Sequence, residues 1–301
     1  FQDLEPRCKA RHSACMKHLL SFGHGFSAQA LSRLIAGNGW RVTGTTRSAE
    51  RADVVKASGA DALIWPGTSI SDALASADAL LISAAPGRDG DPVLAELKEE
   101  IAKRADQFDW VGYLSTTGVY GDHKGGWVDE GTALSPATQR GQARVEAEAA
   151  WQEIPGLPLH IFRLAGIYGP GRGPFAKVRS GKARRIIKKG QVFSRIHVED
   201  IAAVLLASLH APNPGAIYNL CDDDPAPPQD VISYAAHLLG LPEPPAEDFE
   251  TAEMTPMARS FYAESKKVRN DRIKNELGVV LKYPDYKTGL QALLRQADNH
   301  R

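Results

Sequence analysis

The sequence has little cysteine and no long apolar run. Its 301 residues include three cysteines, Cys8, Cys15 and Cys221, which are too few for a disulfide framework and share no metal-ligand spacing with nearby histidines. We therefore expect a reducing compartment, the cytoplasm. No stretch reaches the roughly 18–20 consecutive apolar residues that a membrane span requires, so the sequence predicts a soluble protein.

An excess of either charge is also missing. The 36 basic and 36 acidic side chains cancel, so the net charge gives no reason to expect nucleic acid or an anionic membrane as a partner. Hydrophobic residues make up 43% of the chain and charged residues 24%, which is ordinary for a globular protein. The length suffices for one large domain or for a large and a small one.

The first segment, FQDLEPRCKARHSAC at positions 1–15, has no periodicity and lacks the apolar core of a secretory signal. We interpret it as a disordered extension ahead of Met16. A basic targeting segment is the alternative, and the two acidic residues within the segment argue against it.

Strand-like and helix-like segments alternate from Met16 onward. The helix-like segments include one that begins at Phe26 and one that Asp91 and Pro92 open as N-cap and first residue. This alternation predicts an α/β fold, a Rossmann-type doubly wound parallel sheet with both faces covered by helices. The expected strands lie at 18–22, 40–46, 62–65, 79–83, 110–115 and 159–164.

After residue 170 the sequence is punctuated by proline and glycine, as in "GPGRGPF" and "CDDDPAPPQD". The segments between these loops are short. We expect a Rossmann domain formed by residues 16–170 plus 191–220. A smaller, discontinuous substrate-binding region is expected from residues 171–190 plus 221–301.

A glycine loop follows the first expected strand, in "SFGHGFSAQAL". Gly23 permits a tight turn, Gly25 lets the backbone approach a pyrophosphate, and Ala28 allows close packing of helix on sheet. The helix that begins at Phe26 would direct its free N–H groups at the phosphates. The pattern predicts dinucleotide binding, and the alternative is an ordinary tight turn between strand and helix.

The end of the second expected strand indicates which dinucleotide. An NAD site calls for an acidic residue about 20 residues beyond the loop, to accept from the ribose 2′-hydroxyl. The sequence has Thr46 and Arg47 there, and a guanidinium can bind a 2′-phosphate through two hydrogen bonds. We therefore expect NADP rather than NAD. The alternative is that Arg47 is a solvated surface cation.

Small residues end the fourth expected strand, at Ser83, Ala84 and Ala85. Ligands of such sheets bind beyond the carboxyl ends of the strands. These three residues are therefore expected to lie against the cofactor.

Three further stretches carry a resemblance. They are "YLSTTGVYGD" at 113–122, "IFRLAGIYGPGR" at 161–172 and "RIHVEDIAAVL" at 195–205. Together with the glycine loop, they resemble the extended short-chain dehydrogenase/reductase family, the NAD(P)-dependent epimerases and dehydratases of nucleotide sugars. The likeness covers nearly all of the chain from Met16 onward.

The resemblance implies a catalytic Ser or Thr, which is Thr116 here, and a Tyr-x-x-x-Lys pair, whose positions fall on Arg140 and Arg144. Arg144 has donors enough to keep the lysine's contact with the nicotinamide ribose. Arg140 cannot replace the tyrosine as an acid, because lowering the pKa of an arginine from above 12 to about 7 would cost about 7 kcal/mol. The family's usual proton donor is therefore expected to be missing.

Two interpretations stay open. In the first, the chain is an atypical NADP(H)-dependent oxidoreductase or epimerase that acts on a nucleotide sugar or a small carbonyl compound, and Tyr120, His123 or Tyr168 donates the proton. Tyr120 also has the simpler interpretation of a packing residue. In the second, the chain is an inactive NADP(H)-binding sensor, and the two arginines hold an anion.

A small anionic molecule is the expected partner, and a homodimer is left open. Substrate-binding residues are expected in the loops beyond the cofactor. We favour a structural role for His197, and the arginines have the alternative interpretation of surface cations. The candidates are His123, Tyr168, Arg172, Arg195 and His197.

Overall fold

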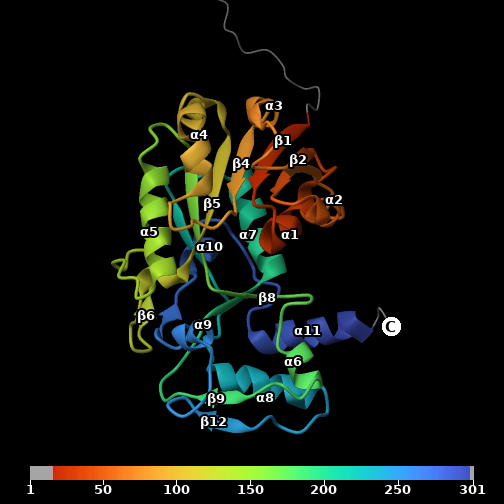
Figure 1. Ribbon diagram of the computed structural model, residues 1–301, viewed down its shortest axis with the longest axis vertical. Coiled ribbons are helices and arrows are strands. Elements are labelled where there is room, and N and C mark those ends of the chain that lie inside the picture. Colours follow the sequence, from red (N-terminus) through yellow and green to blue (C-terminus); the bar gives the residue numbers. More distant parts are fainter. Residues whose placement is uncertain (1–15, 299–301) are drawn as a thin grey trace, which may run out of the picture.

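A computed structural model describes residues 16–298 of the chain, so the extension expected at 1–15 lies outside the described residues. Seven parallel strands form the central sheet, in the order β11-β7-β5-β4-β1-β2-β3 (Figure 1). This order is that of a Rossmann fold, which confirms the predicted fold class. The strands are β1 (Lys17–Phe22), β2 (Trp40–Thr46), β3 (Asp61–Ile64), β4 (Ala79–Ile82), β5 (Trp110–Thr116), β7 (Leu159–Leu164) and β11 (Ile217–Leu220).

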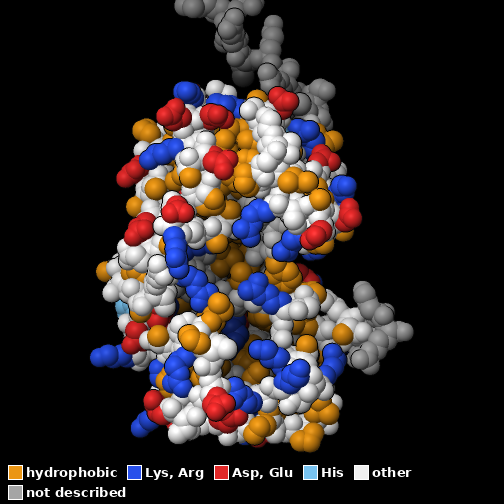
Figure 2. Space-filling model, viewed as in Figure 1, with side chains coloured by type: hydrophobic (Ala, Val, Ile, Leu, Met, Phe, Trp, Pro, Cys, Tyr) orange, Lys and Arg blue, Asp and Glu red, His pale blue; other side chains and the backbone are white. Residues whose placement is uncertain are grey.

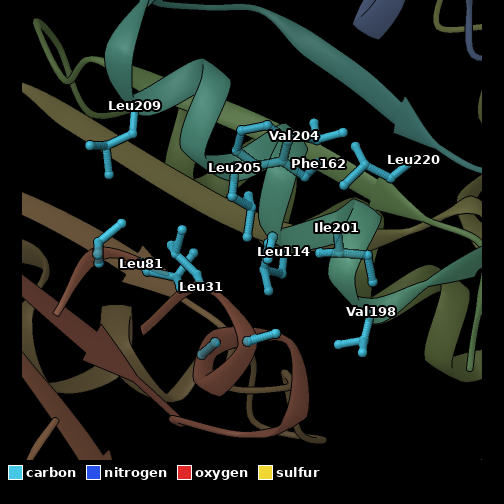
Figure 3. Close-up of a cluster of buried hydrophobic side chains, with 14 of the residues drawn as sticks. Leu31, Leu81, Leu114, Phe162, Val198, Ile201, Val204, Leu205, Leu209 and Leu220 are labelled. Carbon is cyan, nitrogen blue, oxygen red and sulfur yellow. The ribbon is translucent and has the colours of Figure 1, made fainter. Parts of the chain in front are cut away.

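Helices cover both faces of this sheet. Successive residues of a strand point to opposite faces: Leu81 of β4 belongs to one core cluster, and Leu80 and Ile82 belong to the other. Figure 3 shows the first cluster, in which Leu31 of α1 and Val204 of α7 approach the sheet. The helices of these two layers are α1 (Phe26–Ile35), α2 (Ala52–Lys56), α3 (Ser71–Ala75), α4 (Pro92–Ala102), α5 (Gln139–Gln152) and α7 (Val198–His210).

Two of these helices, α4 and α5, begin at a residue whose side chain caps the helix N-terminus. Asp91 caps α4, accepting from the backbone N–H groups of Val93 at 2.9 Å and Leu94 at 3.1 Å, which confirms the predicted N-cap. The same carboxylate accepts from the Trp151 indole of α5 at 3.2 Å. Thr138 caps α5 by accepting from the backbone N–H of Gly141. The start of α5 is thereby fixed.

Most of the remaining elements lie below the sheet's carboxyl edge in Figure 1. Strands pair there in twos, β10 with β8, β12 with β9 and β13 with β6. Tyr168, Phe175 and Leu290 share a separate apolar cluster in this part. The elements are β6 (Trp127–Val128), β8 (Gly166–Tyr168), α6 (Phe175–Arg179), β9 (Arg185–Ile187), β10 (Arg195–His197), α8 (Pro228–Leu238), β12 (Ala246–Asp248), α9 (Pro256–Ser260), β13 (Lys267–Val268), α10 (Asp271–Asn275) and α11 (Tyr286–Asp298).

One C-terminal segment returns to the main sheet. Ile273 of α10, Val279 and Leu281 are buried in the same cluster as the helices α1 and α7. The predicted division of the chain into two regions stays a prediction, and this packing shows that residues of the 221–301 stretch help to build the main core. No helix within residues 16–298 has the length and apolar character to traverse a bilayer.

Candidate functional site

The glycine loop between β1 and α1 makes a tight turn, and its backbone requires glycine at position 23. Gly23 has φ +68°, and a Cβ atom there would lie 2.7 Å from the backbone nitrogen of Ala84. Only glycine tolerates both the left-handed conformation and this approach. Gly25 follows as the N-cap of α1. The loop thus lies directly against the segment that leaves β4.

Strand β2 holds this loop in place. The backbone N–H of Gly23 donates to Thr45 Oγ1 at 2.8 Å, and that of His24 donates to Thr45 O at 3.0 Å. The His24 ring is buried, with Nε2 3.0 Å from Ser58 Oγ. Burial lowers the pKa of His24 to about 4, so the imidazole is neutral at physiological pH.

The first turn of α1 presents unused donors. Gly25 provides no side-chain cap, and the turn contains no acidic residue. Within residues 16–298, the backbone N–H groups of Phe26, Ser27 and Ala28 have no hydrogen-bond acceptor. Free N–H groups and the helix dipole favour an anion at this point.

The end of β2 leaves a cation exposed. Thr46 Oγ1 donates to the Ser48 carbonyl at 3.4 Å. Arg47 is exposed, and its side chain has no hydrogen bond or ion pair with any described residue. Its guanidinium is therefore available to a ligand bound on the glycine loop.

A cavity of about 740 Å³ opens at the carboxyl ends of the strands. Its floor comes from the ends of β5 and β7, at Thr116 and Leu164. Its far wall is the segment that contains α9 and β13. Residues with functional groups or close backbone on its surface include Ala85, Thr116, Gly118, Arg140, Arg144, Tyr168, Arg172, Arg195, Glu264 and Lys266.

The charges on this cavity are unbalanced. Five of its side chains are cationic, Arg140, Arg144, Arg172, Arg195 and Lys266, against a single carboxylate. Figure 2 shows blue side chains around the hollow at the middle of the molecule. A chain without net charge has thus gathered positive charge in one concave place, which favours an anionic ligand.

Arg140 and Arg144 lie on this cavity, at the start of α5, and differ in their partners. Arg144 Nη1 donates to the Leu114 carbonyl at 2.7 Å and to the Tyr113 hydroxyl at 3.0 Å, so it is anchored to β5. Arg140 is exposed, and its guanidinium carbon lies 5.5 Å from the centre of the Phe261 ring. Arg140 can therefore turn towards a ligand. That the two arginines stand at the family's Tyr and Lys positions stays a prediction.

Arg195 lies deeper. Its Nη1 donates to the carbonyls of Phe193 at 2.9 Å and Ala226 at 3.0 Å. Nearby Asp222 is buried, and its carboxylate has no hydrogen-bond partner among residues 16–298. Burial raises the pKa of Asp222 to about 8.

Tyr120 does not line the cavity. It is fully buried, and its hydroxyl donates to Asn219 Oδ1 at 2.7 Å and accepts from Arg163 Nη1 at 3.0 Å. Arg163 is in turn paired with Glu148 at 2.7 Å, with both side chains under 5% exposed. These contacts give Tyr120 the packing role that the sequence left open.

The two candidate histidines also lie off the cavity surface. His123 Nε2 is 3.1 Å from the Tyr120 carbonyl. His197 is buried and caps α7, with Nδ1 accepting from the Glu199 backbone N–H at 3.2 Å. Of the three candidate donors, Tyr168 alone reaches the cavity, and its hydroxyl lies 3.4 Å from the Asp285 carbonyl.

The remaining candidate residues lie near the glycine loop. Ala85 lines the cavity, whereas the backbone N–H groups of Ser83 and Ala84 donate to Phe22 O at 2.9 and 3.0 Å and pin the end of β4 to β1. Arg172 lies over the Phe26 ring, 5.7 Å from its centre. Arg172 therefore joins the glycine loop to the cavity.

Two residues on the cavity went unnoticed in the sequence, Glu264 and Lys266. They lie about 150 positions after Thr116. The stretch that begins at Ser265 resembles the C-terminal segment of the family, but this likeness marks neither residue as part of a site. Only the neighbouring strand β13 could have pointed to them, and a strand of two residues leaves no periodicity to detect in the sequence.

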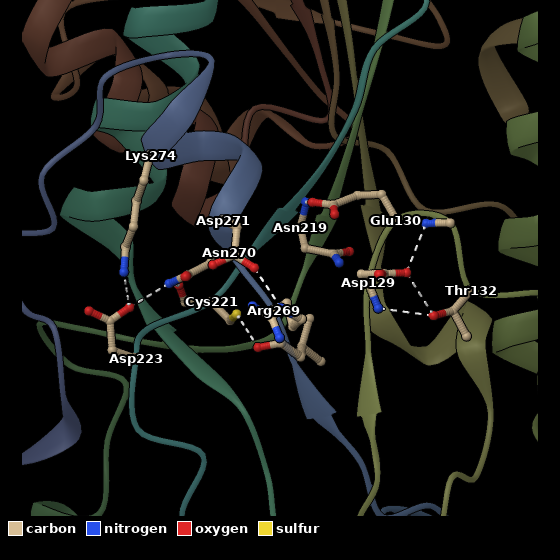
Figure 4. Close-up of polar contacts among 12 residues, drawn as sticks. Asp129, Glu130, Thr132, Asn219, Cys221, Asp223, Arg269, Asn270, Asp271 and Lys274 are labelled. Atoms are coloured by element: carbon tan, nitrogen blue, oxygen red, sulfur yellow. Dashed lines mark hydrogen bonds and ion pairs between the residues drawn. The ribbon is translucent and has the colours of Figure 1, made fainter.

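The wall that carries these two residues is tied to β11. Figure 4 shows Asn270, whose side-chain amide donates to the Cys221 carbonyl at 2.9 Å and to Asp223 at 2.7 Å. Lys274 also binds Asp223, at 2.6 Å. On the other side, Glu130 accepts from the Asn219 backbone N–H at 2.8 Å. The wall is therefore fixed relative to the sheet.

No family model matches the chain, but individual proteins do. Protein YeeZ from Escherichia coli is 32% identical over 284 residues, which cover 90% of this chain and 97% of YeeZ. A functionally unknown conserved protein from Silicibacter pomeroyi has a structure with a TM-score of 0.91 and 64% identity, covering 94% of this chain and 99% of that one.

More distant structures agree in fold. The dTDP-glucose 4,6-dehydratase of Bacillus anthracis, solved with NAD, has a TM-score of 0.77 at 17% identity and covers 95% of this chain and 97% of its own. Further neighbours of the epimerase type were solved with NAD or with NADPH. The chain therefore belongs to the family of protein YeeZ, and its fold is that of the NAD-dependent epimerases and dehydratases.

Proposed function

We propose that the chain is an NADP(H)-dependent oxidoreductase that acts on the carbonyl group of a small anionic substrate. One observation carries the proposal: the free N–H groups at the start of α1 stand beside a cavity with five cations and one carboxylate. The first feature fits a pyrophosphate, and the second fits an anionic substrate.

The residues present fit a nicotinamide dinucleotide. Gly23 lets the loop pack against Ala84, Gly25 adds no side chain at the start of α1, and the N–H groups of Phe26, Ser27 and Ala28 would hold the pyrophosphate. The bound nicotinamide would supply or accept a hydride. NAD and NADPH in the structural neighbours support this cofactor class, and exposed Arg47 favours the 2′-phosphate of NADP.

The cavity residues would bind and orient the substrate. Arg140 and Arg172 are exposed on its surface, and each can bind a carboxylate or a phosphate through two hydrogen bonds. Thr116 lies at the end of β5 and can donate to a carbonyl oxygen. A nucleotide sugar and a small keto acid both satisfy these requirements.

The test measures NADPH oxidation with carboxylated and phosphorylated aldehydes and ketones, each beside its uncharged analogue; 4-carboxybenzaldehyde and benzaldehyde form one pair. We expect the anionic member of a pair to have the lower KM. Arg140→Gln should raise that KM about tenfold or more, because a charge-assisted hydrogen bond contributes about 1.5–3 kcal/mol. Arg179→Gln, at an exposed arginine away from the cavity, is the matched control.

Saturable NADPH binding without oxidation of NADPH by any compound would instead support the second interpretation, an NADP(H)-binding sensor. The cationic cavity is compatible with that function as well, since an anion held there needs no reaction. Absence of NADPH binding would contradict both.

A further inference from the structure

Few groups on the cavity can release a proton at neutral pH. The four arginines keep theirs, because a guanidinium does not deprotonate in proteins. Tyr168 holds its proton firmly: burial and nearby carboxylates raise the pKa of its hydroxyl, and no cation binds that hydroxyl among the described residues. The remaining ionisable side chains on the cavity are Lys266 and Glu264.

Lys266 and Glu264 form a pair with unused hydrogen-bonding capacity. Lys266 Nζ donates to Glu264 Oε2 at 2.5 Å and to the Gly121 carbonyl at 2.8 Å. An ammonium has three N–H donors, so one is left for a ligand. Glu264 Oε1 is buried without a hydrogen-bond partner in the described part of the chain. The two side chains are 10% and 12% exposed, and both residues line the cavity.

The backbone between them is held on several sides. The Ser265 backbone N–H donates to Asp122 Oδ1 at 2.8 Å, and Ser265 Oγ donates to the Gly190 carbonyl at 2.8 Å. The Ser265 carbonyl accepts from the backbone N–H groups of His123 at 3.1 Å and Gly125 at 2.8 Å. The pair therefore projects from a rigid support, as a group that acts on a reacting atom must.

Thr116 and the carbonyl that Lys266 binds lie at the two ends of one short helix. Gly121, which accepts from Lys266 Nζ, ends the short 3-10 helix η3 (Thr117–Tyr120), and Thr116 is the N-cap of that helix. Four residues of 3-10 helix span about 8 Å, at roughly 2 Å each. A compound of about that length in the cavity can place its carbonyl oxygen at Lys266 and another polar group at Thr116.

We propose that Lys266 is the proton donor of this site and that Glu264 returns protons to it from water. The proposal rests on the proposed function. In the reductive direction the carbonyl carbon gains a hydride from the reduced nicotinamide, which is oxidised. The electrons of the C=O π bond pass to oxygen, which takes a proton as a Lys266 N–H bond breaks. The neutral amine then regains a proton from water through the carboxyl of Glu264.

This assignment removes the difficulty that Arg140 creates. An ammonium can serve as an acid, and a guanidinium cannot. Before the proton is transferred, the positive charge of the ammonium also stabilises the negative charge that develops on the carbonyl oxygen. The competing explanation gives Lys266 a purely structural task, holding the Gly121 carbonyl, for which any long cation would suffice.

The first test needs neither cofactor nor turnover. The folded protein is acylated with trace acetic anhydride, and labelling of each lysine is followed by mass spectrometry. We expect Lys266 to be labelled, and we expect 4-carboxybenzyl alcohol, the reduction product of 4-carboxybenzaldehyde, to slow this labelling several-fold. Lys267, which is off the cavity, should be unaffected. Unlabelled Lys266 in the folded protein, or labelling that the alcohol does not change, would overturn the proposal.

The second test is the kinetics of Lys266→Arg, which keeps the charge and the donors but not the acid. We expect kcat with 4-carboxybenzaldehyde to fall by roughly 10²–10⁴-fold, the usual loss of a general acid, with KM changed less than about threefold. Lys267→Arg is the control. Lys266→Met and Glu264→Gln, checked for unchanged melting temperature, should also lower kcat more than they raise KM.

A kcat within threefold of the wild type in Lys266→Arg would show that charge suffices and that Lys266 is structural. In that case NADPH oxidation by the wild type would leave the proposed function standing. If the wild type binds NADPH but oxidises it with no carbonyl compound, the proposed function fails, and the proton donor with it.

Discussion

At the scale of single residues, the cation at the end of β2 is the clearest determinant of cofactor choice. Arg47 is exposed and has no described partner, and no carboxylate follows β2 within the first three residues. An acidic residue there would repel a 2′-phosphate, and a free guanidinium attracts it.

Replacement of Arg47 by alanine should therefore discriminate between the two cofactors. We expect the Kd for NADPH to rise about tenfold or more, the value of one charged hydrogen bond, while the Kd for NADH stays within about twofold. Fluorescence titration of each dinucleotide measures both, and Arg33→Ala, at an exposed arginine near the far end of α1, is the control. Equal losses for NADPH and NADH would contradict the assignment.

A second residue, His24 of the glycine loop, makes the stability of the fold depend on pH. His24 is buried and neutral, and its pKa is lowered to about 4 from 6.5 by burial. Above pH 6.5 neither the folded nor the unfolded chain protonates it, so its contribution to stability is fully present. Between pH 6.5 and about 4 the unfolded chain takes up a proton that the folded chain refuses, and stability is lost.

This difference predicts how steeply the free energy of unfolding changes with pH. The free energy of unfolding should fall by up to about 1.4 kcal/mol per pH unit below pH 6.5 through His24. Urea unfolding at pH 7, 6 and 5 measures it, and the slope should be shallower in His24→Asn. The exposed His210 provides the comparison, since His210→Gln should leave the slope unchanged. Identical slopes in the wild type and both variants would exclude His24 as a contributor.

At the scale of elements, the β1–α1 connection shows how one close approach shapes the cofactor site. Gly23 and Gly37 both have positive φ, at +68° and +78°. A Cβ atom at Gly23 would meet backbone atoms of Ala84 at 2.7 Å, whereas one at Gly37 has nothing within 4 Å. The two positions share the conformational requirement and differ in the contact.

The pair Gly23→Ala and Gly37→Ala separates these effects. Gly37→Ala should cost about 1 kcal/mol of stability, the strain of an alanine in this conformation, and leave NADPH affinity unchanged. Gly23→Ala should cost more and weaken NADPH binding at least tenfold, because the loop must move away from β4. Urea unfolding and NADPH titration measure the two quantities. Equal NADPH affinity in both variants would show that the loop does not bind the cofactor.

Several elements follow from local sequence because local physics decides them. The Asp91–Pro92 start of α4 is a cap with a favoured first residue, and the strand expected at 159–164 coincides with β7. The loop at Gly23 needs glycine wherever it occurs. Tyr120 was harder to place, because its hydroxyl finds Asn219, which is 99 positions away. A candidate next to a motif need not face the cavity.

At the scale of the whole molecule, the site is assembled from parts that only the fold brings together. Thr116 ends a strand of the sheet, and Lys266 comes from a short segment near the C-terminus, held by Asp122 and Gly190 through Ser265. No sequence spacing relates them. The fold class and the glycine loop could be predicted, whereas the edge strand β11 and the far wall of the cavity were not.

Charge distribution is likewise a property of the whole molecule. The composition gives equal numbers of acidic and basic side chains, yet one cavity collects four arginines and a lysine. The Glu148–Arg163 pair is buried behind it, and acidic groups elsewhere balance the sum. Net charge gave no reason to expect nucleic acid as a partner, and it said nothing about where a small anion would bind.

The central claim is that the glycine loop and the cationic cavity form one site for a nicotinamide dinucleotide and an anionic carbonyl compound. A crystal structure of the protein with NADPH tests it most directly. The account predicts the pyrophosphate on the N–H groups of Phe26, Ser27 and Ala28, the 2′-phosphate beside Arg47, and the nicotinamide ring at the cavity next to Thr116. A dinucleotide bound elsewhere, or a ring directed away from Thr116 and Lys266, would contradict it.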